Sequence, residues 1–472
     1  MDISIKNQTS LLKILPYITG IIALLVLSLW VFRQPEIELT ERVPGTDNVI
    51  GEEPEAKSGG DVFSGSLTVG NAAPANIAGS WPNFRGLDYD SINKESIKLD
   101  RSWAESEPKE IWGMDVGEGY AGAAILDGKV YLLDYDAEAQ ADVMLCLSLA
   151  DGGEIWRYSY PVAIKRNHGM SRTVPAVTDK YLVSIGPMCH VLCLDPNTGE
   201  FLWAFDLVEQ YGTVIPEWYA GQCPIIEQDK AIIAPGGEDV LMMAVDCATG
   251  DIIWKTPNPN AWNMTHSSII PMDILGQRTY VYCASGGVVG VSAQDGSILW
   301  ETTDWKISIA TVPSPVQVGE DLIFLSGGYN SGSMMLKIKD ENGNLVPETL
   351  FRLKPNVFGS DQQTPIFYKG YIYGVRPDKQ MVCLDLNGSV VWKSGTANRF
   401  GIGPYMIADG MMYILDDSGL LTLAEARSDT YNQLAQSQVL HGHDAWGPMA
   451  MVKGRLILRD LTRMVCLDVA AK

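Results

Sequence analysis

Short runs of apolar residues, each bounded by turn residues, recur along the chain from about residue 80 onward. One repeated phrase is a strand, a tight turn and a second strand that ends in Trp. It reads LADGGEIW, DPNTGEFLW, DCATGDIIW, AQDGSILW and LNGSVVW, and PKEIW supplies an early copy of its last strand. The NG, DG and TG pairs are typical of turns between antiparallel strands. We expect the terminal tryptophans to pack between neighbouring sheets as structural residues, namely Trp112, Trp156, Trp203, Trp254, Trp300 and Trp392.

A second phrase precedes the first in each repeat: a Pro or small residue, a few apolar residues, a turn and an apolar strand. The aligned positions are Pro175, Pro224, Pro315, Pro365, Pro404 and Pro448, with Ile269 and Ala123 in the two remaining repeats. Successive positions are 39 to 52 residues apart, which is close to the length of a propeller blade. Each repeat holds about four short strands. The pattern therefore predicts an all-β fold, an eight-bladed β-propeller of four-stranded antiparallel blades.

The last repeat ends with MVCLDVAAK, before any strand that carries Trp, whereas PKEIWGMDV lies alone near the start. We expect residues 110–116 to pair with residues 464–469 and so close the ring, because closure removes exposed sheet edges. Two repeats depart from the Trp phrase. The fifth has Phe351 in the place of Trp, and the seventh has no Trp.

The first 79 residues do not follow the repeat. After a short N-terminal segment, 1–14, residues 15–32 form an uncharged run long enough to span a bilayer as a helix. A cleaved signal peptide is the alternative, although no A-x-A site follows. Residues 33–79 are acidic and rich in Gly, Pro, Ala and Ser, which predicts a flexible linker before a propeller domain at 80–472. We expect a membrane-anchored protein with its propeller on the periplasmic or extracytoplasmic side.

The net charge of −22 argues against a nucleic-acid-binding surface, which needs clustered Lys and Arg. The eight cysteines include no CxxC pair. Four of them, Cys146, Cys193, Cys383 and Cys466, hold the same place in a repeat, as expected for small buried strand residues.

The recurrent LDxxTGxxxW phrase, and GSWPNFRG at residues 79–86, resemble the bacterial PQQ-binding-like, quinoprotein-type β-propeller repeat. That family includes quinoprotein alcohol dehydrogenases, which bind PQQ and Ca²⁺, and the propeller lipoprotein of the outer-membrane β-barrel assembly machinery, which binds protein partners. The phrase is common to both groups. This chain lacks the adjacent cysteine pair of many such dehydrogenases, and no Glu, Asn and catalytic Asp set can be placed by motif. The resemblance favours a binding protein, with a PQQ- and calcium-dependent oxidoreductase as the alternative.

Polar residues gather just before the innermost strand of several repeats, at one mouth of the expected channel. The candidate ligand-binding residues are His168, Arg172, Trp218, Gln222, His266, Gln363, Arg399, His443 and Asp444. The arginines suit carboxylates, although neighbouring acidic residues could pair with them instead. His168, His266 and His443 could hold a metal, but no ligand spacing supports one. No catalytic motif appears, so the expected function is the binding of a protein partner or small ligand in the cell envelope.

Overall fold

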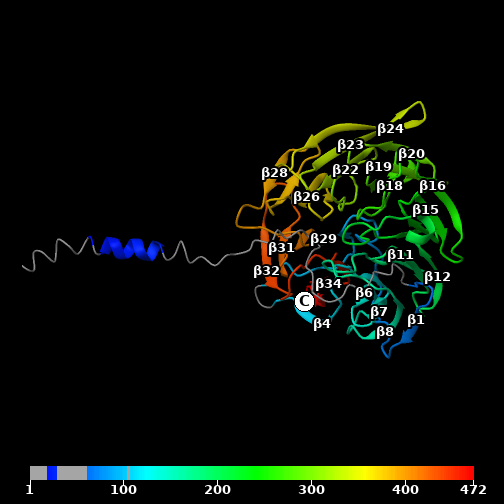
Figure 1. The fold of residues 1–472 in the computed structure, drawn as a ribbon, viewed down its shortest axis with the longest axis horizontal. Coiled ribbons are helices and arrows are strands. Elements are labelled where there is room, and N and C mark those ends of the chain that lie inside the picture. The colour runs from blue at the N-terminus through cyan, green and yellow to red at the C-terminus, as the bar shows by residue number, and fades with distance from the viewer. Residues whose placement is uncertain (1–16, 18, 29–60, 104–106, 472) are drawn as a thin grey trace, which may run out of the picture. The chain divides into compact units, whose positions relative to one another are not determined.

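The computed structural model describes residues 17, 19–28, 61–103 and 107–471. The chain divides into two units, residues 1–54 and residues 55–472, of which the second contains all the described strands. These strands form eight antiparallel blades around a central channel (Figure 1). The eight-bladed, all-β propeller predicted from the repeats is therefore confirmed.

In blades 1 to 7, four consecutive strands run from the channel to the rim. Blade 1 consists of β5 (Ala124–Leu126), β6 (Lys129–Asp136), β7 (Ala141–Ser148) and β8 (Glu154–Pro161), and blade 2 of β9 (Ala176–Val177), β10 (Leu182–Ile185), β11 (His190–Leu194) and β12 (Phe201–Asp206). Blade 3 consists of β13 (Ile225–Glu227), β14 (Lys230–Ile233), β15 (Val240–Asp246) and β16 (Ile252–Pro257), and blade 4 of β17 (Ile270–Ile274), β18 (Gln277–Ala284), β19 (Gly287–Ser292) and β20 (Ile298–Thr302). Blade 5 consists of β21 (Val316–Gln317), β22 (Leu322–Gly327), β23 (Gly332–Glu341) and β24 (Asn344–Leu353). Blade 6 consists of β25 (Ile366–Tyr368), β26 (Tyr371–Val375), β27 (Met381–Leu384) and β28 (Val390–Lys393). Blade 7 consists of β29 (Tyr405–Ala408), β30 (Met411–Leu415), β31 (Leu420–Glu425) and β32 (Gln433–Gln438). One short helix, α2 (Leu207–Tyr211), follows blade 2 and is capped by Asp206.

Blade 8 joins the two ends of the propeller. Its inner strands are β33 (Ala450–Val452), β34 (Arg455–Arg459) and β35 (Arg463–Asp468), and its outer strand is β4 (Lys109–Asp115). Trp112 lies opposite Cys466 in the antiparallel register. The predicted closure of the ring by the early Trp strand is confirmed, with the strand bounds shifted by one residue.

The six predicted structural tryptophans are all buried, with 1 to 8% of their surface exposed. Four of them, Trp112, Trp156, Trp203 and Trp254, pack against a glycine in the turn of the next blade. A Cβ at Gly152 would lie 2.8 Å from the Trp112 ring, and its φ of 72° is in the left-handed region. In blade 5 Phe351 takes over this role, since a Cβ at Gly388 would lie 2.9 Å from the Phe351 ring. The turn glycine and the terminal aromatic residue thus form one inter-blade contact.

The cysteines are structural throughout the described chain. All eight are buried and free. The four repeat-equivalent ones lie opposite a Trp on the adjacent strand, in the pairs Cys146–Trp156, Cys193–Trp203, Cys383–Trp392 and Cys466–Trp112. A small side chain at this place leaves room for the indole, which is why the repeat keeps both residues.

Side chains next to the aligned prolines link blade to blade around the channel. The Val174 N–H donates to Cys223 Sγ at 3.2 Å, and the Cys223 N–H donates to Ser268 Oγ at 3.0 Å. The Ser268 N–H donates to Ser314 Oγ at 3.0 Å, and the Ser314 N–H donates to Thr364 Oγ1 at 2.9 Å. This chain of bonds fixes blades 2 to 6 relative to one another at the base of the channel mouth.

The sequence predicts a flexible linker at 33–79. Residues 33–60 lie outside the described residues, whereas residues 61–79 are described and structured. Strand β1 (Ser66–Val69) pairs with β8 and adds an outer strand to blade 1. The linker prediction is wrong for residues 61–79, because backbone hydrogen bonding to an open sheet edge needs no apolar pattern.

Of the expected anchor at 15–32, residues 17 and 19–28 are described and are helical. Within the described residues, no helix is both long and apolar enough to cross a membrane.

Residues 80–93, called here the axial segment, cross the channel. β2 (Ser80–Trp81) pairs with β5 of blade 1, and β3 (Ile92–Asn93) pairs in parallel with β29 of blade 7. Between them, the buried Arg85 donates to the carbonyls of Thr364 and Pro365 in blade 6, each at 3.0 Å. Segments far apart in the sequence therefore meet on the axis, and the axial segment forms a floor beneath the channel mouth.

Candidate functional site

A cavity of about 290 Å³ lies at the channel mouth, above the axial segment. Its size is close to that of small-molecule pockets in general. Phe84 of the axial segment forms its floor, and its walls come from the segments that precede the innermost strands. Four of the predicted site residues line it: His168, Arg172, Trp218 and His266.

Arg172 is the principal charge in this cavity. Its Nε donates to the Trp218 carbonyl, and its guanidinium lies 4.9 Å from the centre of the Tyr120 ring, a cation–π contact. Its Nη2 is buried and has no hydrogen-bond partner among the described residues. Burial lowers the pKa of Arg172 to about 10, so the side chain stays charged at neutral pH. A buried cation with an open donor is costly unless an acceptor reaches it.

His266 lies beside this charge. Burial, and then the charge of Arg172, lower the pKa of His266 to about 4, so the imidazole is neutral at physiological pH. Its Nε2 is buried without a hydrogen-bond partner among the described residues. Its ring centre is 6.1 Å from that of Trp218, which forms part of the same wall. The cavity thus brings two unsatisfied nitrogen atoms together with apolar ring faces.

Two further lining residues, Tyr120 and Trp446, form an aromatic stack. The centres of the two rings are 5.1 Å apart. The Tyr120 hydroxyl donates to Asp444 Oδ2 at 3.3 Å, while Trp446 Nε1 donates to Asp417 Oδ1 at 2.8 Å. Both acidic side chains therefore hold the aromatic wall in place from behind, and neither lines the cavity.

Other predicted site residues lie away from this cavity. Gln222 is fully buried and bonds Ala234 through both ends of its amide, at 2.9 and 3.1 Å, so its role is structural. Gln363 donates to the Gly403 carbonyl at 3.0 Å and faces a smaller neighbouring cavity. Arg399 is exposed and lines neither cavity. His443 is 76% exposed at its side chain, with Nδ1 3.4 Å from Asp444 Oδ2.

Several lining residues were missed by the sequence reasoning. Phe84 lies in the axial segment, which shows no repeat, and Tyr120 precedes β5, the innermost strand of blade 1. Tyr329 comes from a turn within blade 5 rather than from a segment before an innermost strand. The GSWPNFRG motif was the only available signal for Phe84.

The lining does not fit a PQQ–calcium pair. Ca²⁺ takes six to eight oxygen ligands, usually including carboxylates. No Asp or Glu is among the described residues that line the cavity, whereas Arg172 would suit the carboxylates of the quinone. Across the described ranges, no group of three or more His, Cys, Asp or Glu side chains is placed to hold a metal ion. The cavity thus offers a cation and aromatic faces without the acidic groups of a calcium site.

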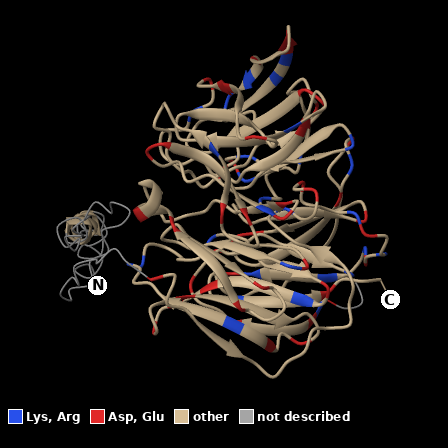
Figure 2. Ribbon diagram, turned by 90° about the vertical axis from the view of Figure 1, so that its right-hand side faces the viewer, with Lys and Arg blue, Asp and Glu red and all other residues tan. Residues whose placement is uncertain are grey.

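Charged residues elsewhere on the propeller are mixed in sign. Figure 2 shows acidic and basic residues interspersed along the loops and outer strands. The open donor of Arg172 at the channel mouth is therefore a local feature of a chain whose net charge is −22.

The fold and the motifs together define a β-propeller of the PQQ-like repeat class. The family described as outer membrane protein assembly factor BamB matches residues 139–394, more than half of the chain, and the chain belongs to this family. No curated protein sequence matches the chain.

Among solved structures, BamB from Moraxella catarrhalis is similar at 11% identity, with a TM-score of 0.54, over 77% of this chain and 98% of that one. The computationally designed Ika8 protein is similar at 11% identity, with a TM-score of 0.53, over 76% and 99% of the two chains. A europium-containing methanol dehydrogenase reaches a TM-score of 0.48 at 11% identity, over 80% and 89%. At such identities these likenesses concern the fold alone.

Proposed function

We propose that this protein is a binding propeller of the cell envelope whose channel mouth recognises a carboxylate on its partner or ligand. The observation that carries the proposal is the buried Nη2 of Arg172, which has no partner among the described residues. Guanidinium and carboxylate form strong, charge-assisted hydrogen bonds, and the cavity lining holds no acidic residue that would compete.

The walls favour a flat apolar group next to that carboxylate. Trp446 and Trp218 both line the cavity and offer indole rings on which an aromatic group would stack. His266 Nε2 adds one hydrogen-bonding atom near Arg172. A free aromatic acid and the end of an extended peptide with a C-terminal aromatic residue share this chemistry.

The name of the family, an assembly factor of the outer membrane, supports a protein partner in the envelope over an enzymatic substrate. A quinoprotein oxidoreductase has less support, because none of the described residues that line the cavity is an Asp or Glu that could bind calcium or abstract a proton.

Replacing Arg172 tests the carboxylate site. We expect Arg172→Gln to weaken benzoate binding about 10- to 100-fold, since charge-assisted hydrogen bonds contribute about 1.5–3 kcal/mol. Isothermal titration calorimetry of the full chain measures the affinity. Arg399→Gln is the matched control, because Arg399 is exposed and lies outside the cavity. Equal benzoate affinity in Arg172→Gln and the wild type would refute the site.

The same titration distinguishes the two sources of the carboxylate. A peptide that ends in phenylalanine would bind as the free acid and not as the amide if the partner is a protein. Tighter binding of benzoate than of the peptide acid would favour a small molecule.

The proposal places the propeller outside the cytoplasm, anchored through the apolar run at 15–32. We expect an alkaline phosphatase fused after residue 60 to be active in cells, because this enzyme needs an oxidising compartment. A reporter that is active only in the cytoplasm, fused at the same point, is the control. Activity of the cytoplasmic reporter alone would reverse the proposed topology.

A further inference from the structure

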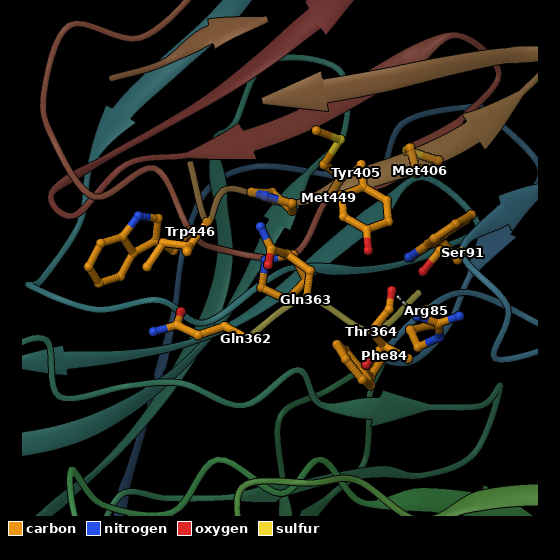
Figure 3. Close-up of a pocket in the computed structure, with 14 residues that line it drawn as sticks. Phe84, Arg85, Ser91, Gln362, Gln363, Thr364, Tyr405, Met406, Trp446 and Met449 are labelled. Carbon is orange, nitrogen blue, oxygen red and sulfur yellow. Dashed lines mark hydrogen bonds between the residues drawn. The ribbon is translucent and has the colours of Figure 1, made fainter. Parts of the chain in front are cut away.

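A second, smaller cavity adjoins the channel mouth. Its volume is about 90 Å³, and it lies between the axial segment and blades 6, 7 and 8 (Figure 3). It shares four lining residues with the larger cavity, namely Phe84, Gln362, Trp446 and Pro448. The two cavities are therefore neighbours, and the side chains of Gln362 and Trp446 stand at their boundary.

One hydroxyl in the lining of this side cavity has no hydrogen-bond partner among the described residues. It belongs to Tyr405, which is buried. Figure 3 shows that hydroxyl directed towards the space between Thr364, Arg85 and Ser91. Burial raises the pKa of Tyr405, so the hydroxyl keeps its proton and can donate it.

Arg85 adds a positive charge to the same wall. Its three recorded hydrogen bonds all go to backbone carbonyls, those of Tyr89, Thr364 and Pro365. A guanidinium carries five N–H groups, so two remain after these bonds. Burial lowers the pKa of Arg85 to about 10, which leaves it charged at neutral pH. No Asp or Glu is among the described residues that line the side cavity.

Each of the two adjoining cavities thus contains an arginine and a donor atom that has no hydrogen-bond partner among the described residues, and no described residue in either lining is acidic. We infer that the side cavity is a second compartment of the ligand site, and that the ligand is a small aromatic dicarboxylate with one acidic group in each compartment. This inference rests on the proposed carboxylate site at Arg172. The compartment of about 90 Å³ has room for one small acidic group, and because it adjoins the larger cavity, one small molecule can reach both.

The test compares mono- and dicarboxylates on the full chain. Benzoate is titrated by calorimetry beside phthalate, isophthalate, terephthalate and biphenyl-4,4′-dicarboxylate, which vary the separation of the two acidic groups. We expect the best dicarboxylate to bind wild type at least about 10-fold more tightly than benzoate. No advantage for any dicarboxylate would overturn the inference.

Tyr405→Phe locates the second acidic group. The hydroxyl has no hydrogen-bond partner among the described residues, so we expect its removal to leave the fold intact, and an unchanged melting temperature checks this. We expect Tyr405→Phe to lower the dicarboxylate affinity about 10-fold and to leave benzoate binding unchanged. An undiminished dicarboxylate advantage in Tyr405→Phe would also overturn the inference.

Failure of the inference is distinguishable from failure of the proposed function. If benzoate binding depends on Arg172 but no dicarboxylate gains affinity, only the second compartment is refuted. If benzoate binding does not depend on Arg172, the primary site itself is refuted.

Discussion

Trp112→Ala should lower the free energy of unfolding by about 3–5 kcal/mol, the usual effect of removing a buried Trp side chain. Trp112 is 7% exposed, and its Nε1 donates to the Leu149 carbonyl of blade 1 at 3.1 Å. The substitution therefore removes both an apolar contact and a hydrogen bond at the seam where β4 closes the ring on β35. Urea unfolding measures the loss.

Trp203→Ala is the matched control for that seam. Trp203 is 6% exposed, lies opposite Cys193 and donates to the Cys247 carbonyl, so its contacts repeat those of Trp112 in blade 2. Both variants should lose similar stability. Only Trp112→Ala should accelerate hydrogen exchange in β4 and β35, because only there does the strand close the ring. Unchanged exchange in β4 would show that Trp112 does not hold the seam.

The stability of the protein should fall as the pH rises from about 4 to 7 through one buried carboxyl group, that of Asp142. This residue in β7 is fully buried, and its Oδ2 accepts a hydrogen bond from the Tyr160 hydroxyl at 2.8 Å. Its Oδ1 has no partner among the described residues. Burial raises the pKa of Asp142 to about 7; the Tyr160 hydrogen bond opposes this shift, and the charge of Asp134 adds to it.

The sign of the effect follows from proton linkage. Between the unfolded pKa and about 7, the folded state holds a proton that the unfolded state has released, so each pH unit lowers the free energy of unfolding by about 1.4 kcal/mol. Over roughly three pH units the loss reaches about 4 kcal/mol, and above pH 7 it levels off. Below pH 4 the contribution is fully present.

Asp142→Asn should remove this loss. An amide oxygen still accepts from Tyr160, and the side chain no longer ionises. We expect the variant and the wild type to be about equally stable at pH 4, and the variant to be about 4 kcal/mol more stable at pH 8. Asp179→Asn, at an exposed position, should show no such difference. Urea unfolding of the variant and the wild type at pH 4, 6 and 8 measures both free energies of unfolding. If their difference is the same at all three pH values, Asp142 is not the group responsible for the pH dependence.

The blades were predictable because the sequence repeats the contacts that hold them together. The Trp at the end of one repeat contacts the Gly in the turn of the next, and both residues recur at the same places in successive repeats. Even the substitution of Phe351 for Trp was visible, since it keeps an aromatic ring against Gly388. The axial segment was not predictable, because each of its contacts is unique and leaves no period in the sequence.

The candidate site was predictable only in part, for a related reason. Position in the repeat places a residue at the channel mouth but does not direct its side chain. His168, Trp218 and Asp444 have φ of 58°, 63° and 56°, so their segments bend individually and do not share one geometry. Gln222 shows a second limit, because a buried amide that bonds the backbone looks the same in sequence as one that meets a ligand.

The pairing of β4 with β35 has a consequence for how the chain reaches its native state. The hydrogen-bonded side chains of Glu110 and Arg463 are 353 residues apart in the sequence. Blades 2 to 6 can each form from a continuous stretch as it leaves the ribosome, but blade 8 must wait until nearly the whole chain has been made. Until then β4 is an unpaired strand and the ring has two open edges, which are prone to associate with other chains. Such distant pairing slows folding, so the last step is expected to be the slow one and the one at which a chaperone that covers strand edges would act.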